Sequence, residues 1–421
     1  MKQFIQSMLA ALAKAVVRKY RPRIVAITGS VGKTSAKEAI VQVLKQSFEA
    51  RGGAKNYNNE LGVPLTVIGA RSGGRSPLRW LIIFVKGLRL LLGRVDYPKF
   101  LVLEMAADHP GDIAYLADIA PPDIAVITAV APAHTEFFGS IEAVEKEKAT
   151  LIERLPPTGL AVLNADDERV RRMAGAAHGR IISYGFETGA DVRAEGYVLH
   201  FEPREGVADA GLRFELSYQG ARESVILKGV AGRPHVLAAL AGTAVGLAAG
   251  MPLSEIAQGL LRYEGPPGRL RILAGIKGSI LLDDTYNASP AAMLEALETL
   301  RAVAVEEGCR RVAVLGDMLE LGAYGEEGHA AVGQRAAELG IDLLIAVGEL
   351  SRDLARAGRS AGLPEERVFE FTDREKAGRF AQDRIEKGDV ILVKGSRGMR
   401  LESVVKELMA EPLRADELLA H

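Results

Sequence analysis

The sequence has one cysteine, one tryptophan and almost no net charge. A lone Cys309 excludes an internal disulfide and a cysteine-rich zinc site, and it favours a reducing, cytoplasmic location. A net charge of −1 over 421 residues excludes a global basic field, so no nucleic-acid partner is expected. No apolar run approaches the roughly 18 residues of a membrane-spanning helix. With 48% hydrophobic and 25% charged residues, the composition is typical of a globular protein of two or three domains.

Short β-branched runs alternate with helical sequence from residue 23 onward. Runs at 23–28, 100–105 and 124–130 each precede a helical or loop segment, such as the helix expected over 33–48. This alternation predicts an α/β fold with a parallel sheet. Between 184 and 228 polar and apolar residues alternate, which predicts a small antiparallel part.

The stretch YEGPPGRLRIL interrupts this pattern with two prolines and two glycines, which indicates a hinge. After it the alternation restarts, and this predicts a second, Rossmann-like doubly wound domain. We therefore expect an N-terminal amphipathic helix over residues 1–23, a central domain over 24–266 and a C-terminal domain over 267–421.

The segment TGSVGKTS, between the first strand and its helix, has the features of a phosphate-binding loop. Gly29 and Gly32 permit a turn of backbone N–H groups, Lys33 can reach the outer phosphates, and the Thr34 hydroxyl can bind Mg²⁺. The full motif has a further glycine where this chain has Ile27. Strand, turn and helix are nevertheless all present, so a P-loop-type nucleotide site is predicted. Its residues are Gly29, Ser30, Val31, Gly32, Lys33, Thr34 and Ser35.

Five further motifs, together with the loop, resemble the Mur ligases, which join amino acids or peptides in cell-wall assembly, and their folylpolyglutamate synthase relatives. They are NYNNELGVPLT (56–66), LEMAADHPGDI (103–113), DDTYNASPAAM (283–293), VLGDMLELG (314–322) and VKGSRGM (393–399). They are most similar to the branch that adds D-alanyl-D-alanine to a muramoyl-tripeptide. The resemblance implies ATP-dependent amide bond formation through an acyl phosphate, in peptidoglycan precursor synthesis, with two Mg²⁺ ions.

Activation of a carboxylate by ATP needs metal ions, for which oxygen ligands and an imidazole are expected. Glu104 ends one strand and His134 follows another, and the resemblance implies that both bind Mg²⁺ beside Thr34. Lys148 stands where the family carries a lysine that is often carbamylated. Because an ammonium beside Mg²⁺ would be repelled, we expect the carbamate here. The alternative is a solvated helix lysine, like its neighbour Lys146.

In the C-terminal domain the resemblance assigns a second set of residues. It implies that Arg269, in the hinge, contacts the γ-phosphate when the domains close; a surface linker arginine is the alternative. The segment expected to meet ribose and adenine contains Asp283, Asp284, Tyr286 and Asn287. Either acid could instead cap the helix expected over 290–300.

The two substrates are expected at two other segments. By resemblance, Lys394, Ser396 and Arg397 lie near the incoming amino substrate, where Arg397 could pair with the carboxylate of the dipeptide. The residues that could hydrogen-bond the muramoyl-peptide are Asn56, Asn58 and Asn59. An asparagine-rich turn that stabilises itself is the alternative for these three.

Two departures from the family pattern stand out. The usual GRHN and its following asparagine are replaced by GRPHVLA, so that His235 is left to contact the adenine. The UDP-substrate domain that normally precedes the loop is not expected in residues 1–23, which are too few for such a fold. We therefore expect the muramoyl-peptide to bind without a main contribution from uridine.

Two segments, 1–21 and 78–95, predict amphipathic helices with basic residues. In the second, one face would carry Trp80, Ile83, Phe84, Leu88, Leu91 and Leu92. We favour a helix packed on the core with snorkelling cations; peripheral contact with the membrane is the alternative. Two other functions stay open: a related ligase that acts on a lipid-linked wall precursor or a polyglutamate, and a non-catalytic nucleotide-binding scaffold at the membrane.

Overall fold

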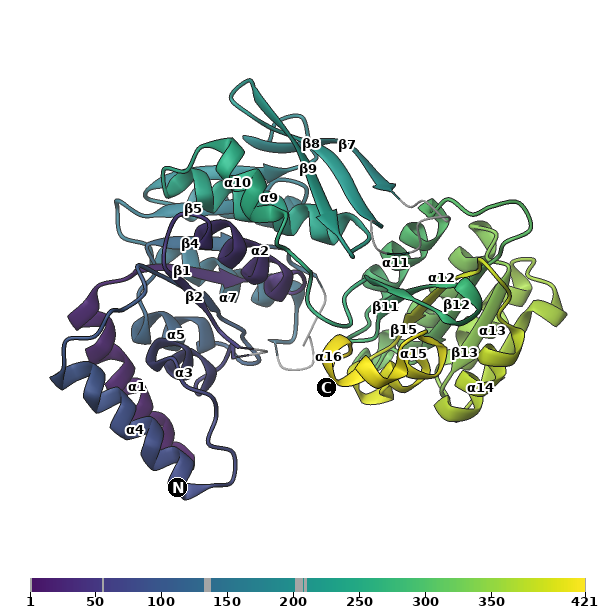
Figure 1. Ribbon diagram of the computed structural model, residues 1–421, viewed down its shortest axis with the longest axis horizontal. Helices are drawn as coiled ribbons and strands as arrows, with labels where there is room; N and C mark the ends of the chain where they lie inside the picture. Colours follow the sequence, from purple (N-terminus) through teal and green to yellow (C-terminus); the bar gives the residue numbers. More distant parts are fainter. Residues whose placement is uncertain (1, 55–56, 132–137, 201–206, 208–209, 421) are drawn as a thin grey trace. The chain divides into compact units, whose positions relative to one another are not determined.

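The computed structural model describes residues 2–54, 57–131, 138–200, 207 and 210–420 (Figure 1). The chain divides into two compact units. The first comprises Met1–Gly196, Phe214–Val225 and Val236–Tyr263, and the second comprises Tyr197–Arg213, Ile226–His235 and Glu264–His421.

Most of a nine-stranded sheet with the order β2-β3-β1-β4-β5-β6-β7-β8-β9 belongs to the first unit; one end each of β7, β8 and β9 is assigned to the second. The strands are β1 (Arg23–Thr28), β2 (Ala50–Gly52), β3 (Phe100–Glu104), β4 (Ile124–Ile127), β5 (Leu160–Asn164), β6 (Arg180–Gly185), β7 (Val192–His200), β8 (Gly211–Tyr218) and β9 (Ala221–Lys228). Neighbours are parallel from β2 to β7. Gln219 and Gly220, with φ of 48° and 84°, form the two-residue turn between β8 and β9, a connection that only antiparallel neighbours allow. The predicted mixture of a parallel sheet and a small antiparallel part is confirmed.

Helices cover both faces of this sheet. They are α1 (Lys2–Tyr20), α2 (Lys33–Lys45), α3 (Gly62–Ile68), α4 (Pro77–Leu92), α5 (Asp112–Ile119), α7 (Ile141–Glu153), α8 (Glu168–Arg172), α9 (Arg233–Ala248) and α10 (Leu253–Leu260). Ile24 and Ala26 of β1 belong to one apolar core with side chains of α1, α3, α5 and α7. On the opposite face α2 packs against α9 and α10, where Gly246 and Gly259 let the helices approach Val43 closely.

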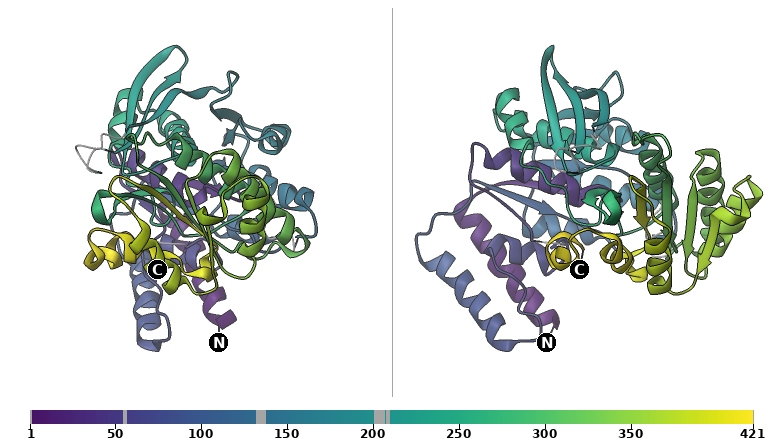
Figure 2. Two further views of the ribbon diagram at one scale, coloured as in Figure 1. Left: turned by 90° about the vertical axis from the view of Figure 1, so that its right-hand side faces the viewer. Right: turned by 45° about the vertical axis from the view of Figure 1, so that its right-hand side comes forward.

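The helix pair α1 and α4 packs side by side at the edge of the first unit (Figures 1 and 2). Leu12 of α1 lies against Gly87 of α4. Further along both helices, Lys19 donates to the Leu90 carbonyl at 2.8 Å. The two helices therefore run in the same direction. Within the described residues, no helix has both the length and the apolar character needed to cross a bilayer.

The apolar face predicted for α4 is only partly correct. Ile83 is buried in the core, but Leu88 and Leu92 are 50% and 87% exposed. The sequence assigned them to the packed face because the helix carries apolar residues on two of its faces, and periodicity alone does not say which face is covered.

The second unit contains a six-stranded sheet with the order β10-β11-β15-β12-β13-β14, in which only the β10–β11 pair is antiparallel. The strands are β10 (Arg271–Ala274), β11 (Ile280–Asp284), β12 (Arg311–Gly316), β13 (Leu343–Val347), β14 (Val368–Phe371) and β15 (Val390–Lys394). The helices are α11 (Pro290–Ala302), α12 (Gly325–Glu338), α13 (Ser351–Ser360), α14 (Arg374–Arg384), α15 (Glu402–Leu408) and α16 (Ala415–Leu418).

Alternate residues of the second sheet face different helical layers. Leu282 and Leu315 belong to the core formed with α11, α12 and α13. Leu281 and Val314 belong to the core formed with α14 and α15. Helices on both faces of a mainly parallel sheet define a doubly wound fold, as the sequence predicted.

Candidate active site

The loop after β1 has the backbone of a phosphate-binding turn. Gly29 has a φ of 150°, and a Cβ there would lie 2.0 Å from the Thr128 hydroxyl oxygen. Gly32 has a φ of 86° and begins α2. Ile27, which replaces the motif's first glycine, is a fully buried residue of β1 and pairs with Glu104 of β3. In this chain β1 continues through Ile27 to Thr28, and the turn begins only after it. Residue 27 therefore does not need to be a glycine.

Lys33 lies over this loop. Its ammonium donates to the carbonyls of Gly29 at 2.6 Å and Ser30 at 3.2 Å. Thr128, at the end of β4, donates to the Val31 carbonyl at 2.6 Å and ties the loop to the sheet. Thr128 could not be selected from the sequence, because its partners lie about a hundred residues earlier in the chain.

A hydroxyl and a carboxylate face each other beside the loop. The Thr34 hydroxyl donates to one oxygen of Glu104 at 3.1 Å, and the Asn58 amide donates to the other at 3.1 Å. Thr34 and Glu104 are both buried. Oxygen donors of this kind fit Mg²⁺, which is usually held by one or two carboxylates together with phosphate oxygens and water. In the structure Asn58, which the sequence predicted at the substrate, orients Glu104.

Lys148 of α7 is buried at the same place. One pocket is lined by Gly29, Ser30, Lys33, Ala106, Ala107, Asp108, Phe138, Val144 and Lys148. Burial, assisted by the nearby Lys33 ammonium, lowers the pKa of Lys148 from 10.5 to about 7, against the opposing attraction of Glu147 and Asp108. The alternative of a solvated lysine is wrong, since Lys148 is only 5% exposed.

Glu147, which the sequence did not single out, anchors α7. Its carboxylate accepts from the backbone N–H groups of Gly111 and Ile113, both at 2.8 Å. These contacts hold the turn of α7 that carries Lys148 against the start of α5. Partners 34 and 36 residues away leave no local signal in the sequence.

The remaining residues predicted in the first unit are distributed as follows. Asn59 accepts from the backbone N–H of Gly62 at 3.0 Å, at the start of α3, so this asparagine stabilises its own turn. Val31 is exposed and Ser35 is buried in α2. Asn56 and His134 lie outside the described residues. Among those that are described, no group of three or more His, Cys, Asp or Glu side chains could hold a metal ion.

The second unit gathers its predicted residues around Tyr286. The Arg269 guanidinium lies 4.2 Å from the centre of the Tyr286 ring, and that of Arg397 lies 5.0 Å from it. Lys394 forms an ion pair with Asp284 at 2.7 Å and donates to the Asn287 carbonyl at 2.8 Å. Cations, a ring and an acid thus form one polar cluster.

Asp283 precedes Asp284 of this cluster in the chain and is fully buried. Its carboxylate accepts from the Thr285 hydroxyl at 2.6 Å and from the Gly268 N–H at 3.1 Å. Burial raises its pKa from 3.8 to about 6, although these hydrogen bonds oppose the shift. Of the two adjacent acids, Asp283 fixes the hinge and Asp284 carries the more accessible carboxylate. The carboxylates of the two acids thus contact Thr285, Gly268 and Lys394 rather than the first turn of α11.

His235 and Ser396 are buried as well. The Nε2–H of His235 donates to the Arg269 carbonyl at 2.5 Å, and burial lowers the pKa of the ring from 6.5 to about 4. Ser396 accepts from the Leu319 N–H at 2.9 Å. His235 therefore supports the backbone of Arg269, and Ser396 joins two loops that follow β12 and β15.

The phosphate-binding turn and its facing hydroxyl and carboxylate define a nucleotide-binding protein of the P-loop type. Two sequence profiles match: the Mur ligase middle domain over residues 86–245, and the Mur ligase, glutamate ligase domain over residues 268–397. The chain therefore belongs to the Mur ligase family of ATP-dependent ligases.

Two curated relatives carry the same name. The UDP-N-acetylmuramoyl-tripeptide--D-alanyl-D-alanine ligase of Escherichia coli (strain K12) is 32% identical over 399 residues, which cover 94% of this chain and 79% of the relative. The corresponding ligase of Mycobacterium tuberculosis (strain CDC 1551 / Oshkosh) is 34% identical and covers 96% of this chain and 76% of the relative. The predicted family resemblance is confirmed.

Two solved structures support the assignment of the chain to this family. MurF ligase from Thermotoga maritima in complex with ADP has a TM-score of 0.78 at 27% identity, covering 98% of this chain and 84% of that one. MurF from Acinetobacter baumannii has a TM-score of 0.76 at 28% identity, covering 94% of this chain and 79% of that one.

Proposed function

We propose that the chain adds D-alanyl-D-alanine to a UDP-linked muramoyl-tripeptide, the joining reaction for which its relatives are named, and that it uses ATP to do so. The observation that carries this proposal is the pocket at the loop, where Lys33, Lys148 and the backbone of Gly29 and Ser30 converge. A related ligase acting on another carboxylate and a scaffold without turnover are the two alternatives.

The reaction would proceed in two balanced steps. A carboxylate oxygen of the tripeptide attacks the γ-phosphorus of ATP, which yields an acyl phosphate and ADP. The amino group of the dipeptide then attacks the acyl carbon; an amide forms, inorganic phosphate leaves, and the amine loses its extra proton. The phosphates would bind over Gly29 and Gly32, where Lys33 turns from the loop carbonyls to the phosphoryl oxygens.

Thr34 and Glu104 would hold Mg²⁺, together with His134 and with Lys148 as a carbamate. The metal would neutralise charge on the phosphoryl group. Asn58 keeps Glu104 in place, and Glu147 keeps Lys148 in place. In the second unit Arg269, Asp284, Tyr286 and Asn287 remain the proposed nucleotide contacts, Asp283 and His235 support the hinge, and Lys394, Ser396 and Arg397 remain the proposed contacts of the amino substrate.

Carbamate formation on Lys148 needs an uncharged amine that attacks CO₂ and releases a proton. Burial supports this, because an amine with a pKa near 7 is partly uncharged at neutral pH. With ¹³C-labelled bicarbonate, we expect a carbamate carbon signal that is lost in Lys148→Ala and kept in the neighbouring variant Lys146→Ala. Acetate should partly restore activity to Lys148→Ala. A labelled signal of equal size in Lys148→Ala would contradict the assignment.

The function is tested by ADP release. We expect ADP only when ATP, a muramoyl-tripeptide (UDP-linked or without UDP) and D-alanyl-D-alanine are all present, with one amide formed for each ADP. Lys33→Ala should lower the rate of both products about 10²- to 10³-fold, whereas Lys45→Ala, an exposed lysine at the other end of α2, should leave the rates unchanged. ADP release with another carboxylate alone would favour the first alternative, and nucleotide binding without any turnover would favour the scaffold.

We place the reaction in the cytoplasm, because the substrate is ATP and the one cysteine, Cys309, is free. Peripheral contact with the inner face of the membrane is part of this proposed location, and helix α4 is the element that supports it.

A further inference from the structure

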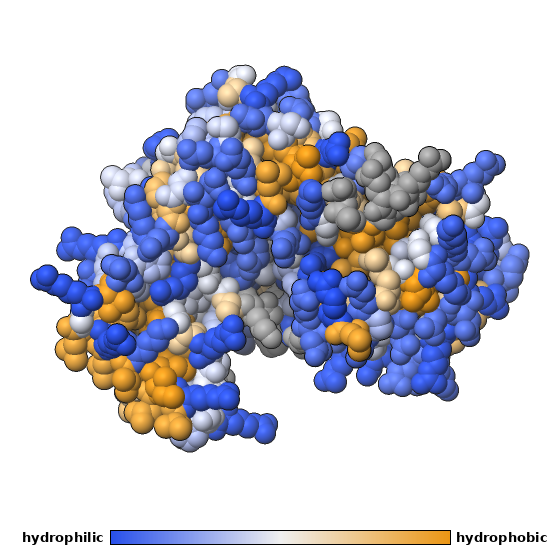
Figure 3. Space-filling model, viewed as in Figure 1, coloured by the Kyte–Doolittle hydropathy of each residue, from blue (hydrophilic) through white to orange (hydrophobic). Residues whose placement is uncertain are grey.

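Helix α4 carries an apolar stripe that no described part of the chain covers. The stripe consists of Leu78, Leu81, Ile82, Val85, Leu88 and Leu92, which are between 50% and 87% exposed. These positions recur every three or four residues and span an arc of about 120° on the helix. Figure 3 shows apolar surface gathered over α1 and α4. We call this surface the α4 stripe.

The α4 stripe is distinct from the face that holds the helix in the fold. Ile83, Gly87 and Leu90 are buried, and they face α1. The helix therefore has one apolar face that packs on α1 and another that meets solvent. Because packing on α1 does not use them, the side chains of the stripe are free to contact a partner.

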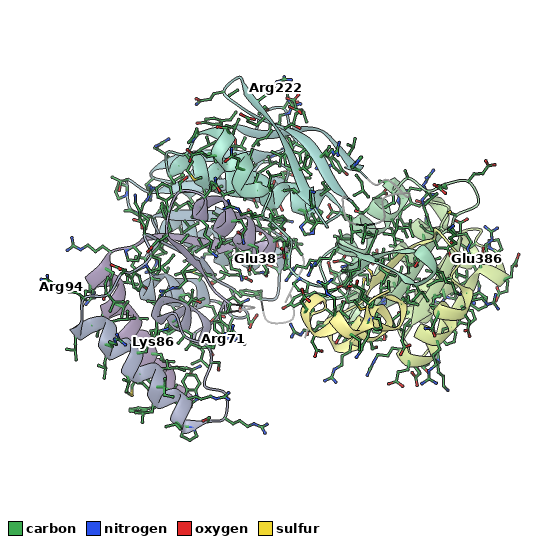
Figure 4. The ribbon with its side chains drawn as sticks, in the orientation of Figure 1. Glu38, Arg71, Lys86, Arg94, Arg222 and Glu386 are labelled. Carbon is green, nitrogen blue, oxygen red and sulfur yellow. The ribbon has the colours of Figure 1, made fainter. Side chains whose placement is uncertain are left out.

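Charge around the α4 stripe has one sign. Residues 61–95 contain six basic side chains and no acidic one, in a chain whose net charge is −1. They are Arg71, Arg75, Arg79, Lys86, Arg89 and Arg94, three of which appear in Figure 4 around α4. At 100° per residue, Arg79 and Lys86 lie just outside one edge of the stripe, and Arg89 lies just inside that edge. The surface therefore combines an aliphatic centre with a cationic border.

We propose that the α4 stripe docks on the surface of a membrane that contains anionic lipids, with α4 lying in the plane of the interface. A helix with a Leu/Ile/Val face bordered by arginine and lysine is typical of interfacial anchors. The aliphatic side chains would enter the acyl region, while the cations would meet lipid phosphates. This docking is independent of the ligase chemistry proposed above.

A second copy of the chain fits this surface less well. In a two-fold dimer the same patch would face itself, so the cationic borders would meet like charges without acidic partners. A protein partner is also disfavoured, because the stripe lacks the tyrosine, phenylalanine and tryptophan that are enriched in protein interfaces. An anionic lipid surface satisfies both the aliphatic centre and the charged border.

Trp80 provides a built-in reporter of docking. It is the one tryptophan of the chain, it lies at the start of α4, and its indole N–H donates to the Gly74 carbonyl at 3.0 Å. It is partly exposed beside the stripe. Its emission should shift to shorter wavelength when the helix enters the interface, without any label on the protein.

The experiment mixes the full chain with vesicles of phosphatidylcholine alone or with added phosphatidylglycerol, and measures flotation and Trp80 emission. We expect binding to the anionic vesicles only, weakened by added salt. Val85→Glu should abolish binding, whereas Leu413→Glu, the same type of change at a 99% exposed leucine of the second unit, should not. Arg79→Gln and Arg89→Gln should each lower the partition coefficient about fivefold. Arg222→Gln, near the β8–β9 turn, should have no effect.

Three outcomes would overturn the proposal: no flotation with either vesicle, equal binding to both vesicles, or unchanged binding of Val85→Glu. A concentration-dependent dimer that Val85→Glu dissociates, without vesicle binding, would assign the stripe to a second copy. ADP release in solution should be the same for Val85→Glu and the wild type. Vesicle binding and ADP release are separate readouts, so failure of the ligase proposal would be recognised independently.

Discussion

At the scale of single residues, His235 makes the stability of the protein depend on pH. Its buried ring has a pKa of about 4, compared with 6.5 in the unfolded chain. Between these values mainly the unfolded chain takes up a proton. The free energy of unfolding, which is at its full value above pH 6.5, therefore decreases as the pH falls from 6.5 to 4. By this linkage, the free energy of unfolding at pH 5 is lower by about 2 kcal/mol at most.

We expect His235→Gln to reduce this pH dependence. Glutamine can keep a donor near the Nε2 position, but it does not titrate. The melting temperature of the variant should therefore fall less between pH 7 and pH 5 than that of the wild type. His178→Gln, at an exposed histidine, is the control and should follow the wild type. Parallel curves for His235→Gln and the wild type would show that the ring is not buried in its neutral form.

At the scale of elements, two adjacent asparagines before α3 have different partners. Asn58 donates to Glu104, and Asn59 accepts from the first turn of α3. We expect Asn58→Ala to lower the rate of ADP formation about 10- to 100-fold with little change in melting temperature, because it removes a contact that orients a metal ligand. Asn59→Ala should cost about 1 kcal/mol of stability and keep the rate.

Kinetics and thermal melts of the two variants separate the possible roles of Asn58. If its amide binds the peptide instead, Asn58→Ala should raise the KM of the tripeptide and leave kcat unchanged. The reverse pattern, an unstable Asn58→Ala and a slow Asn59→Ala, would contradict the assignment of partners.

Local sequence predicted the strands and the phosphate-binding turn well, because each depends on neighbours in the chain. Gly29 and Gly32 have the positive φ that the motif requires. The contacts that orient the site could not be predicted in this way. Glu147 reaches backbone groups of α5, and Asn58 reaches Glu104 across 46 residues. Such pairs are fixed by the packing of elements, for which one sequence carries no periodic signal.

At the scale of the whole molecule, two units with separate cores carry residues proposed for one reaction. Lys33 belongs to the loop of the first unit and Arg269 to the hinge segment of the second. In the structure Lys33 donates to loop carbonyls and Arg269 lies over Tyr286. Both cations are proposed to meet the same γ-phosphate, so their effects on the rate should not be independent.

A double-mutant cycle tests this coupling. Lys33→Ala and Arg269→Ala should each lower kcat/KM by about 10²- to 10³-fold, the usual effect of removing a group that stabilises transition-state charge. If both act on one phosphoryl group, the double variant should lose much less than the product of the two losses. Arg222→Ala, at an exposed arginine of β9, replaces Arg269→Ala in the control cycle and should add nothing to Lys33→Ala. Losses that multiply would mean that the two cations act at separate steps, and Arg269 would then no longer be assigned to the γ-phosphate.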